Sequence, residues 1–174
     1  MVEVGEIAEV IAGQSPEGKY YNSNSDGLPF YQGKTEFEDI HLGQPTTWTS
    51  KTTKIAEKGD ILMSVRAPVG PVNIATQKIC IGRGLAAIRA KKDVDQMFLF
   101  YNLRSMQDRI KGNGGAVFDS INKSQIEKIK IPLPSLEIQK QMVEDMGKEE
   151  EVLTANRRLI ELMERKISQV LTEI

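Results

Sequence analysis

The sequence predicts an α+β protein, in which a mixed, β-rich domain with short helices spans residues 1–134 and one long helix spans residues 135–174. Three observations lead to this prediction. Short apolar runs alternate with Gly- and Pro-containing turns through the first part, as in β-rich folds. Residues 95–110 change to the period of a helix. The last part contains no proline and no glycine after Gly147, and it consists mostly of strong helix formers.

The first elements are short and are separated by turns. Residues 4–12 have apolar side chains in a spacing that suits a short helix or a strand, and a turn at residues 13–16 ends it. Residues 28–33 are expected to form a short edge strand, since proline within a sheet is confined to edges. The polar, Thr-rich residues 45–54 hold the only Trp and are expected to be an exposed loop. Four more short strands are expected, the first of them buried, at residues 61–66, 72–75, 78–81 and 85–90.

Helical elements follow in the second half of the domain. A helix is expected over residues 95–110, and the glycines among residues 112–115 stop it. Either Ser120 or Asn122 is expected to cap a short helical turn that leads to Ile126. Residues 129–134 are expected to be extended, because each proline keeps the residue before it out of the α region.

The long helix has a heptad pattern that indicates a coiled-coil-like dimer seam. With Leu153 at position a, six of the seven a and d residues are apolar, and the polar Asn156 helps to fix the register. A helix of this length spans about 60 Å at 1.5 Å per residue, so it has to protrude, and its apolar stripe needs a partner. The alternative is that the helix packs back on its own domain. The seam residues are Leu153, Asn156, Ile160, Met163, Ile167, Val170 and Ile174.

Composition limits the class of protein. A chain of 174 residues with 40% apolar and 27% charged residues suits one soluble domain with an appended element. It has no apolar run of the roughly 20 residues that span a membrane, and its acidic start does not resemble a signal peptide. The single cysteine, Cys80, excludes an intrachain disulfide and fits a reducing cytoplasm. We therefore expect a cytoplasmic protein without a membrane partner.

The net charge of −1 does not decide whether the protein binds nucleic acid. Residues 1–134 carry 17 Lys and Arg against 15 Asp and Glu, a net of +2, whereas residues 135–174 carry 6 against 9, a net of −3. A net of +2 is not the strongly basic balance that by itself indicates DNA binding. Charge alone therefore leaves a nucleic-acid partner open.

Motifs of catalysis and metal binding are missing or incomplete. His41 is the only histidine and stands in a polar stretch without a nucleophile signature, which favours a solvated loop histidine. One histidine and one cysteine exclude the usual closed zinc sites, and no P-loop motif occurs. Residues 82–87 match G-x-G-x-x-A, but the next stretch is too short for the helix of a βαβ unit. A tight turn between strands, with Arg83 exposed at its tip, is the favoured interpretation, and no bound cofactor, metal or catalytic residue is expected.

Several motifs occur in a fixed order along nearly the whole chain. They are G-Q-S-P at residues 13–16, G-L-P-F-x-Q-G-K at 27–34, G-D-I-L-x-S-V-R-A-P-V-G at 59–70, I-G-R-G-L-A-A-I at 81–88, G-G-x-x-F-x-x-I at 114–121 and I-x-I-P-L-P-x-L-x-x-Q at 129–139. This set resembles the specificity-subunit family of type I restriction–modification systems. The third and the last motif together are the most specific part of the resemblance.

The resemblance implies a non-catalytic DNA specificity subunit with a target-recognition domain (residues 1–134) and a spacer helix (residues 135–174). It implies double-stranded DNA, a methyltransferase (M) subunit and a restriction (R) subunit as partners, with S-adenosylmethionine and ATP bound by those subunits. Full members have two such domains and two helices. This chain therefore resembles a half subunit, natural or truncated, that forms a homodimer through its C-terminal helix and reads a bipartite, palindromic target. The alternative is a protein–protein interaction module with a dimerising helix that binds no DNA.

Candidate DNA contacts follow from the chemistry of base reading. Arginine pairs with guanine, asparagine or glutamine with adenine and the threonine methyl group with thymine, while lysines suit phosphates. Arg66 and Arg83 lie inside the shared motifs, which favours a structural role over target-specific reading. The candidates, which stand in expected loops or beside expected turns, are Tyr20, Tyr21, Gln32, Lys34, Thr49, Lys51, Lys54, Arg66 and Arg83.

Overall fold

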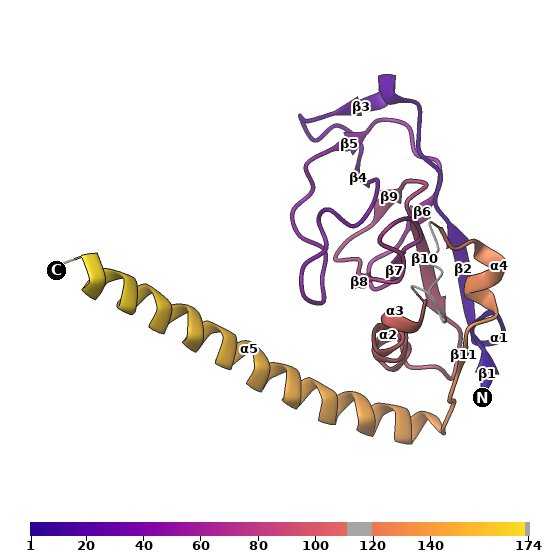
Figure 1. Ribbon diagram of the computed structural model, residues 1–174. Helices are drawn as coiled ribbons and strands as arrows, with labels where there is room; N and C mark the ends of the chain where they lie inside the picture. Colours follow the sequence, from indigo (N-terminus) through magenta and orange to yellow (C-terminus); the bar gives the residue numbers. More distant parts are fainter. Residues whose placement is uncertain (111–119, 173–174) are drawn as a thin grey trace.

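A computed structural model describes residues 1–110 and 120–172 of the chain (Figure 1). A β-rich body with short helices takes up most of the length, and one helix of 37 residues, α5 (Leu136–Thr172), extends away from it. The predicted α+β class, a β-rich part followed by a long C-terminal helix, is confirmed. The predicted helix stop at residues 112–115 and the seam residue Ile174 lie outside the described residues.

An antiparallel four-stranded sheet with the order β2–β10–β7–β8 forms the centre of the body. Successive side chains of a strand point to opposite faces, and both faces of this sheet are buried. Ile61 and Met63 pack in one hydrophobic cluster with α2 (Gln96–Ser105), and Leu62 packs in a second cluster. This explains why the strand sequences are almost continuously apolar. The strands are β2 (Ala8–Ala12), β7 (Ile61–Ser64), β8 (Val72–Ile74) and β10 (Leu85–Ala90).

A second sheet has the order β3–β5–β4–β9–β6. The prediction that residues 28–33 form an edge strand is wrong, because β4 lies between β5 and β9. The two halves of β4 pair with different neighbours: Leu28 and Pro29 pair with β5, and Phe30 and Tyr31 pair with β9. Because Pro29 pairs with β5 and pairing with β9 begins only at Phe30, the missing N–H group of Pro29 is tolerated inside the sheet. The strands are β3 (Tyr21–Asn22), β4 (Leu28–Tyr31), β5 (Trp48–Thr49), β6 (Ile55–Ala56) and β9 (Ile79–Ile81).

The N-terminal segment lies beside the start of α5 (Figure 1). Strand β1 (Val2–Glu3) pairs antiparallel with β11 (Lys130–Ile131), which confirms that the proline-containing segment before α5 is extended. Residues 4–12, for which a helix or a strand is expected, form both: α1 (Val4–Ile7) comes first and β2 follows it.

The helices of the body begin at side-chain caps. The Asp95 carboxylate accepts two backbone N–H groups at 2.9 Å and starts α2 (Gln96–Ser105). Asn122, one of the two expected caps, accepts one backbone N–H group at 3.0 Å and starts α4 (Lys123–Glu127). Each cap satisfies donors that the first turn of a helix leaves without a partner.

The single helix predicted over residues 95–110 is divided in two. Helix α2 ends at Ser105. The N–H group of the next residue, Met106, donates to the carbonyl oxygen of Leu103 at 3.2 Å, and α3 (Gln107–Ile110) follows. Apolar residues continue across this tight turn at nearly the same spacing, so the sequence pattern does not reveal the break.

Helix α5 is attached to the body by a buried amide and a half-buried ion pair. Gln139 is only 1% exposed, and its side-chain oxygen accepts the backbone N–H of Asp95 at 2.8 Å. Its NH2 group donates to the carbonyl oxygen of Pro134 at 2.9 Å. Eleven residues farther along the helix, Glu150 accepts a guanidinium N–H of Arg104 at 3.4 Å. These contacts fix the direction in which the helix leaves the body.

The second half of α5 is exposed on all sides. Every residue from 151 to 172 is exposed, so the helix does not pack back on the body over this length. An exposed ion pair between Arg157 and Asp39, at 2.7 Å, joins this part of the helix to the body, and pairs of this kind contribute little to stability. The described apolar seam residues are 51–59% exposed: Leu153, Ile160, Met163, Ile167 and Val170. Asn156 is exposed as well.

Candidate nucleic-acid interface

A cleft of about 640 Å³ opens between the segment after β2, the end of β4 and the turn between β9 and β10. It brings together Tyr21, Gln32 and Arg83, three of the predicted DNA contacts, although they are far apart in the sequence. The wall of the cleft is partly aromatic and partly polar. The lining residues are Ser15, Pro16, Glu17, Tyr21, Phe30, Gln32, Glu36, Thr47 and Arg83.

Ser15 links Gln32 and Arg83 by hydrogen bonds. Its hydroxyl oxygen accepts the backbone N–H of Arg83 at 3.2 Å, and the hydroxyl donates to the side-chain oxygen of Gln32 at 2.8 Å. The amide of Gln32 is thereby held in one orientation. Its NH2 group has no partner among the described residues and remains available to a ligand in the cleft.

The turn between β9 and β10 is built around Gln32. A Cβ atom on Gly82 would lie 2.5 Å from the side-chain oxygen of Gln32, and one on Gly84 would collide with its carbonyl oxygen. Only glycine allows this close approach at both positions. The G-x-G-x-x-A match is therefore a strand–turn–strand unit with the exposed Arg83 at its tip, as predicted.

The two predicted tyrosines have different environments. Tyr21 lines the cleft and stacks on Phe30, with ring centroids 4.7 Å apart. Tyr20 is half-buried, and the ammonium groups of Lys19 and Lys51 each lie 5.1 Å from the centroid of its ring. Cation–π attraction of this kind holds the two lysine side chains at the tip of the body, beside β3 and β5.

Thr49 is fully buried, so the expectation that it faces DNA from an exposed loop is wrong. It lies in β5, between β3 and β4, where it pairs with Tyr21 and Leu28. Its hydroxyl donates to the carbonyl oxygen of Lys51 at 2.9 Å, which satisfies the buried group. Part of the predicted loop is thus an internal strand. The other charged or amide candidates are exposed: Gln32, Lys34, Lys51, Lys54, Arg66 and Arg83.

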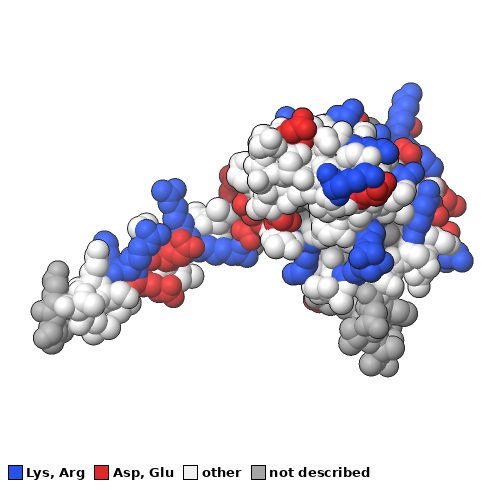
Figure 2. Space-filling view, turned by 90° about the horizontal axis from the view of Figure 1, so that it is seen from above, with Lys and Arg blue, Asp and Glu red and all other residues white. Residues whose placement is uncertain are grey.

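Charges of both signs are intermixed on the surface. Figure 2 shows the body from above, with Lys and Arg side chains spread over this face and Asp and Glu side chains among them. The far end of α5 is mostly uncharged in this view. A site for an anionic partner therefore depends on which basic groups are free of acidic neighbours rather than on net charge.

The buried carboxylate of Asp60 has a structural partner. Asp60 is 3% exposed and accepts two hydrogen bonds from the guanidinium of Arg89, at 2.8 and 2.7 Å. This hydrogen bonding raises the pKa of Arg89. His41 is exposed, as predicted. In residues 1–110 and 120–172, no group of three or more His, Cys, Asp or Glu side chains is placed to hold a metal ion, and no helix is long and apolar enough to cross a membrane.

Sequence reasoning missed two residues that organise this part of the molecule. Ser15 stands in a Gly-Gln-Ser-Pro turn, and its role depends on the approach of Gln32 from a distant strand. Gln139 is a polar residue near the start of a helix, where it looks like a solvated side chain. The sequence does contain a signal for each residue, because Ser15 belongs to the motif at residues 13–16 and Gln139 to the motif at residues 129–139.

Comparison with known proteins gives a consistent result. Residues 1–171 match the family described as type I restriction modification DNA specificity domain. The chain is 43% identical over 175 residues to the putative type I restriction enzyme MjaX specificity subunit of Methanocaldococcus jannaschii, in a match that covers 98% of this chain and 41% of that subunit.

Two solved structures have the same fold. A chain of a type I restriction–modification system, described in terms of complex assembly and conformational transition, is 37% identical with a TM-score of 0.89, over 97% of this chain and 42% of that one. The HsdS subunit from Thermoanaerobacter tengcongensis is 39% identical with a TM-score of 0.81, over 90% and 38%. The chain thus spans about two fifths of the length of these relatives. Since the family match covers almost all of it, the chain belongs to the family of type I restriction–modification DNA specificity domains.

Proposed function

We propose that this chain is the non-catalytic, DNA-reading part of a type I restriction–modification system and that it reads one half of a bipartite target. Two copies join through α5 and present two identical bodies to one duplex. A protein with two-fold symmetry matches a target with two-fold symmetry, so the target is an interrupted palindrome. The cleft that contains Gln32 and Arg83 supplies groups suited to base edges and phosphates.

The exposed apolar stripe of α5 is the observation that carries this proposal. Its described apolar a and d residues are more than half exposed on a helix that projects from the body. Full burial of one such side chain contributes about 1.5–3 kcal/mol, so several of them together favour association with a second helix. Asn156 breaks the apolar series once and favours a single register of the pair.

The proposal includes the partners that supply the chemistry. A methyltransferase subunit and a restriction subunit dock on the dimer and bind S-adenosylmethionine and ATP. The methyltransferase has to take its target base out of the stack, and the specificity dimer determines where on the DNA this occurs. Membership of the family supports these assignments. The buried thiol of Cys80 fits the cytoplasm as the compartment.

Sedimentation of the purified chain tests the dimer. Ile167→Glu places a charge in the seam and is expected to produce monomers, whereas Ser168→Glu places the same charge one residue away, outside the a and d positions, and leaves the dimer intact. A wild-type chain that remains monomeric at high concentration contradicts the proposal. If both variants disrupt the dimer equally, the a and d residues are not the ones that form its interface.

Selection of duplexes from a random pool tests DNA reading. The chain, assembled with its methyltransferase subunit, is expected to enrich two inverted half-sites at a fixed separation. A protein–protein interaction module without DNA binding would enrich no sequence. Enrichment of a single half-site would leave DNA recognition in place but would refute the symmetric dimer as the reading unit.

A further inference from the structure

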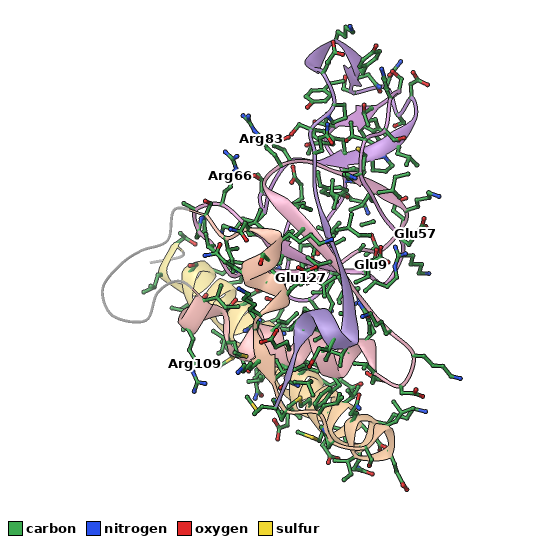
Figure 3. The ribbon with its side chains drawn as sticks, turned by 90° about the vertical axis from the view of Figure 1, so that its right-hand side faces the viewer. Glu9, Glu57, Arg66, Arg83, Arg109 and Glu127 are labelled. Atoms are coloured by element: carbon green, nitrogen blue, oxygen red, sulfur yellow. The ribbon has the colours of Figure 1, made fainter. Side chains whose placement is uncertain are left out.

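One side of the body carries three exposed arginines. Arg83, Arg66 and Arg109 project from the same side in Figure 3, in this order from the tip of the body towards α5. Glu9 and Glu57 point to the opposite side in the same view. Three exposed arginines therefore lie on one side of the body, away from Glu9 and Glu57.

The first two arginines stand on neighbouring turns with fixed backbones. The N–H group of Val65, next to Arg66, donates to the carbonyl oxygen of Gly84 at 2.9 Å, and Gly84 follows Arg83. The hydroxyl of Ser64 donates to the carbonyl oxygen of Arg66 at 3.1 Å. Both guanidinium groups thus extend from rigid parts of the body.

The third arginine is joined to this unit by close packing. The loop that begins at Arg66 contains Gly70 at φ +107°, and a Cβ atom on Gly70 would lie 2.7 Å from the carbonyl oxygen of Gln107. Gln107 is the first residue of α3, the short helix that carries Arg109. The three arginines therefore belong to one continuous edge, which we name the arginine edge (Arg66, Arg83 and Arg109).

Among the described residues, the arginine edge differs from the other arginines of the body in being unpaired. Arg89 is held by Asp60, and Arg104 is held by Glu150. Within residues 1–110 and 120–172, the guanidinium groups of the arginine edge have no ion pair and no hydrogen bond. Their charge is free for an external anion.

We propose that the arginine edge binds the phosphates of one DNA backbone and thereby determines which side of the body faces the duplex. This inference rests on the proposed function. A guanidinium group matches the oxygen geometry of a phosphate, and charges spaced along an edge suit a polyanion better than a single small anion. The cleft lies beside Arg83. The NH2 group of Gln32 therefore faces the DNA groove next to the backbone that the arginine edge binds.

Salt titration of DNA binding tests the arginine edge. The full chain, alone and assembled with its methyltransferase subunit, is titrated with a random-sequence duplex at several salt concentrations. The logarithm of the DNA-binding constant falls linearly with the logarithm of the salt concentration. The steepness of this slope decreases by about 0.9 for each phosphate that a variant no longer neutralises. Arg66→Ala, Arg83→Ala and Arg109→Ala are each expected to lower it by about this amount. Arg66→Lys keeps the charge and is expected to keep most of the slope.

Lys58→Ala is the matched control. It removes one exposed positive charge from the turn that also contains Glu57, on the side of the body opposite the arginine edge, and is expected to leave the slope unchanged. If the wild-type chain binds DNA but the arginine variants keep its slope, or if Lys58→Ala lowers the slope equally, the inference is overturned while the proposed function stands. A wild-type complex that binds no duplex overturns both.

Discussion

The amide of Gln139 joins the start of α5 to the start of α2, because its oxygen accepts the backbone N–H of Asp95 at 2.8 Å while the Asp95 carboxylate caps α2. One buried side chain thus connects the long helix to the core of the body.

Replacement of Gln139 by alanine is expected to destabilise the protein. The change leaves the half-buried N–H of Asp95 and the carbonyl oxygen of Pro134 without partners, at a cost of about 2 kcal/mol. Urea unfolding measures this difference. Gln141→Ala, which removes an exposed amide bonded to Asp145, serves as the control and is expected to change the free energy of unfolding very little. Equal effects of the two changes would show that Gln139 is not an anchor.

Gln32 is expected to discriminate between bases. A bidentate contact between an amide and adenine contributes about 1–3 kcal/mol of discrimination, so Gln32→Ala should lower the preference at one base pair of each half-site by about 5- to 150-fold. Ser15→Ala frees the amide and should lower the same preference by a smaller factor, because the orientation of Gln32 is then no longer fixed. Selection from duplexes that vary at each position gives the measurement.

Lys34→Ala is the comparison for Gln32, since Lys34 is exposed and carries a charge rather than an amide. It is expected to weaken binding to all duplexes alike. If Gln32→Ala has that same uniform effect, the side chain does not read a base.

Stability is expected to fall at high pH because of Tyr31. Burial raises the pKa of its hydroxyl from 10.0 to about 12, and Glu36 adds to the effect. The hydroxyl also donates to the carbonyl oxygen of Gly43 at 2.9 Å. The folded state thus binds this proton more tightly than the unfolded state does. The contribution is complete below pH 10 and is lost between about pH 10 and pH 12, up to roughly 2–3 kcal/mol.

Thermal unfolding of the wild type and of Tyr31→Phe over this pH range isolates the effect, because the titration of lysines is common to both proteins. The variant is expected to lose less stability with rising pH. Parallel pH profiles would contradict the prediction.

Two glycines are expected to respond in opposite ways to replacement by alanine. Gly70 has φ +107° and lies against Gln107, so Gly70→Ala introduces both backbone strain and a collision and should cost more than about 1 kcal/mol. Gly147 lies inside α5 with open space around it, so Gly147→Ala should stabilise the helix by about 0.5–1 kcal/mol. Shifts of the unfolding midpoint in the same direction would contradict this account.

The sequence predicts those parts of the fold that local patterns determine. The buried strands, the cap at Asn122 and the exposed stripe on α5 each follow from spacing within a short segment. The place of β4 inside its sheet does not, because it depends on β5 and β9, which are far away in the sequence. The burial of Thr49 escapes prediction for the same reason. The orientation of the Gln32 side chain depends on Ser15 and Gly82, which only the folded chain brings to it.

The two attachments of α5, at Gln139 and Glu150, also determine where the helix tolerates insertions. An extra residue between them would turn Glu150 by about 100° and shift it by about 1.5 Å, so the pair with Arg104 could not form while Gln139 kept its bonds. Beyond Arg157 no such constraint applies in the described part of the helix. There, seven added residues would lengthen the arm by about 10 Å and return its apolar face almost to the same direction, whereas two or three would turn that face away from its partner.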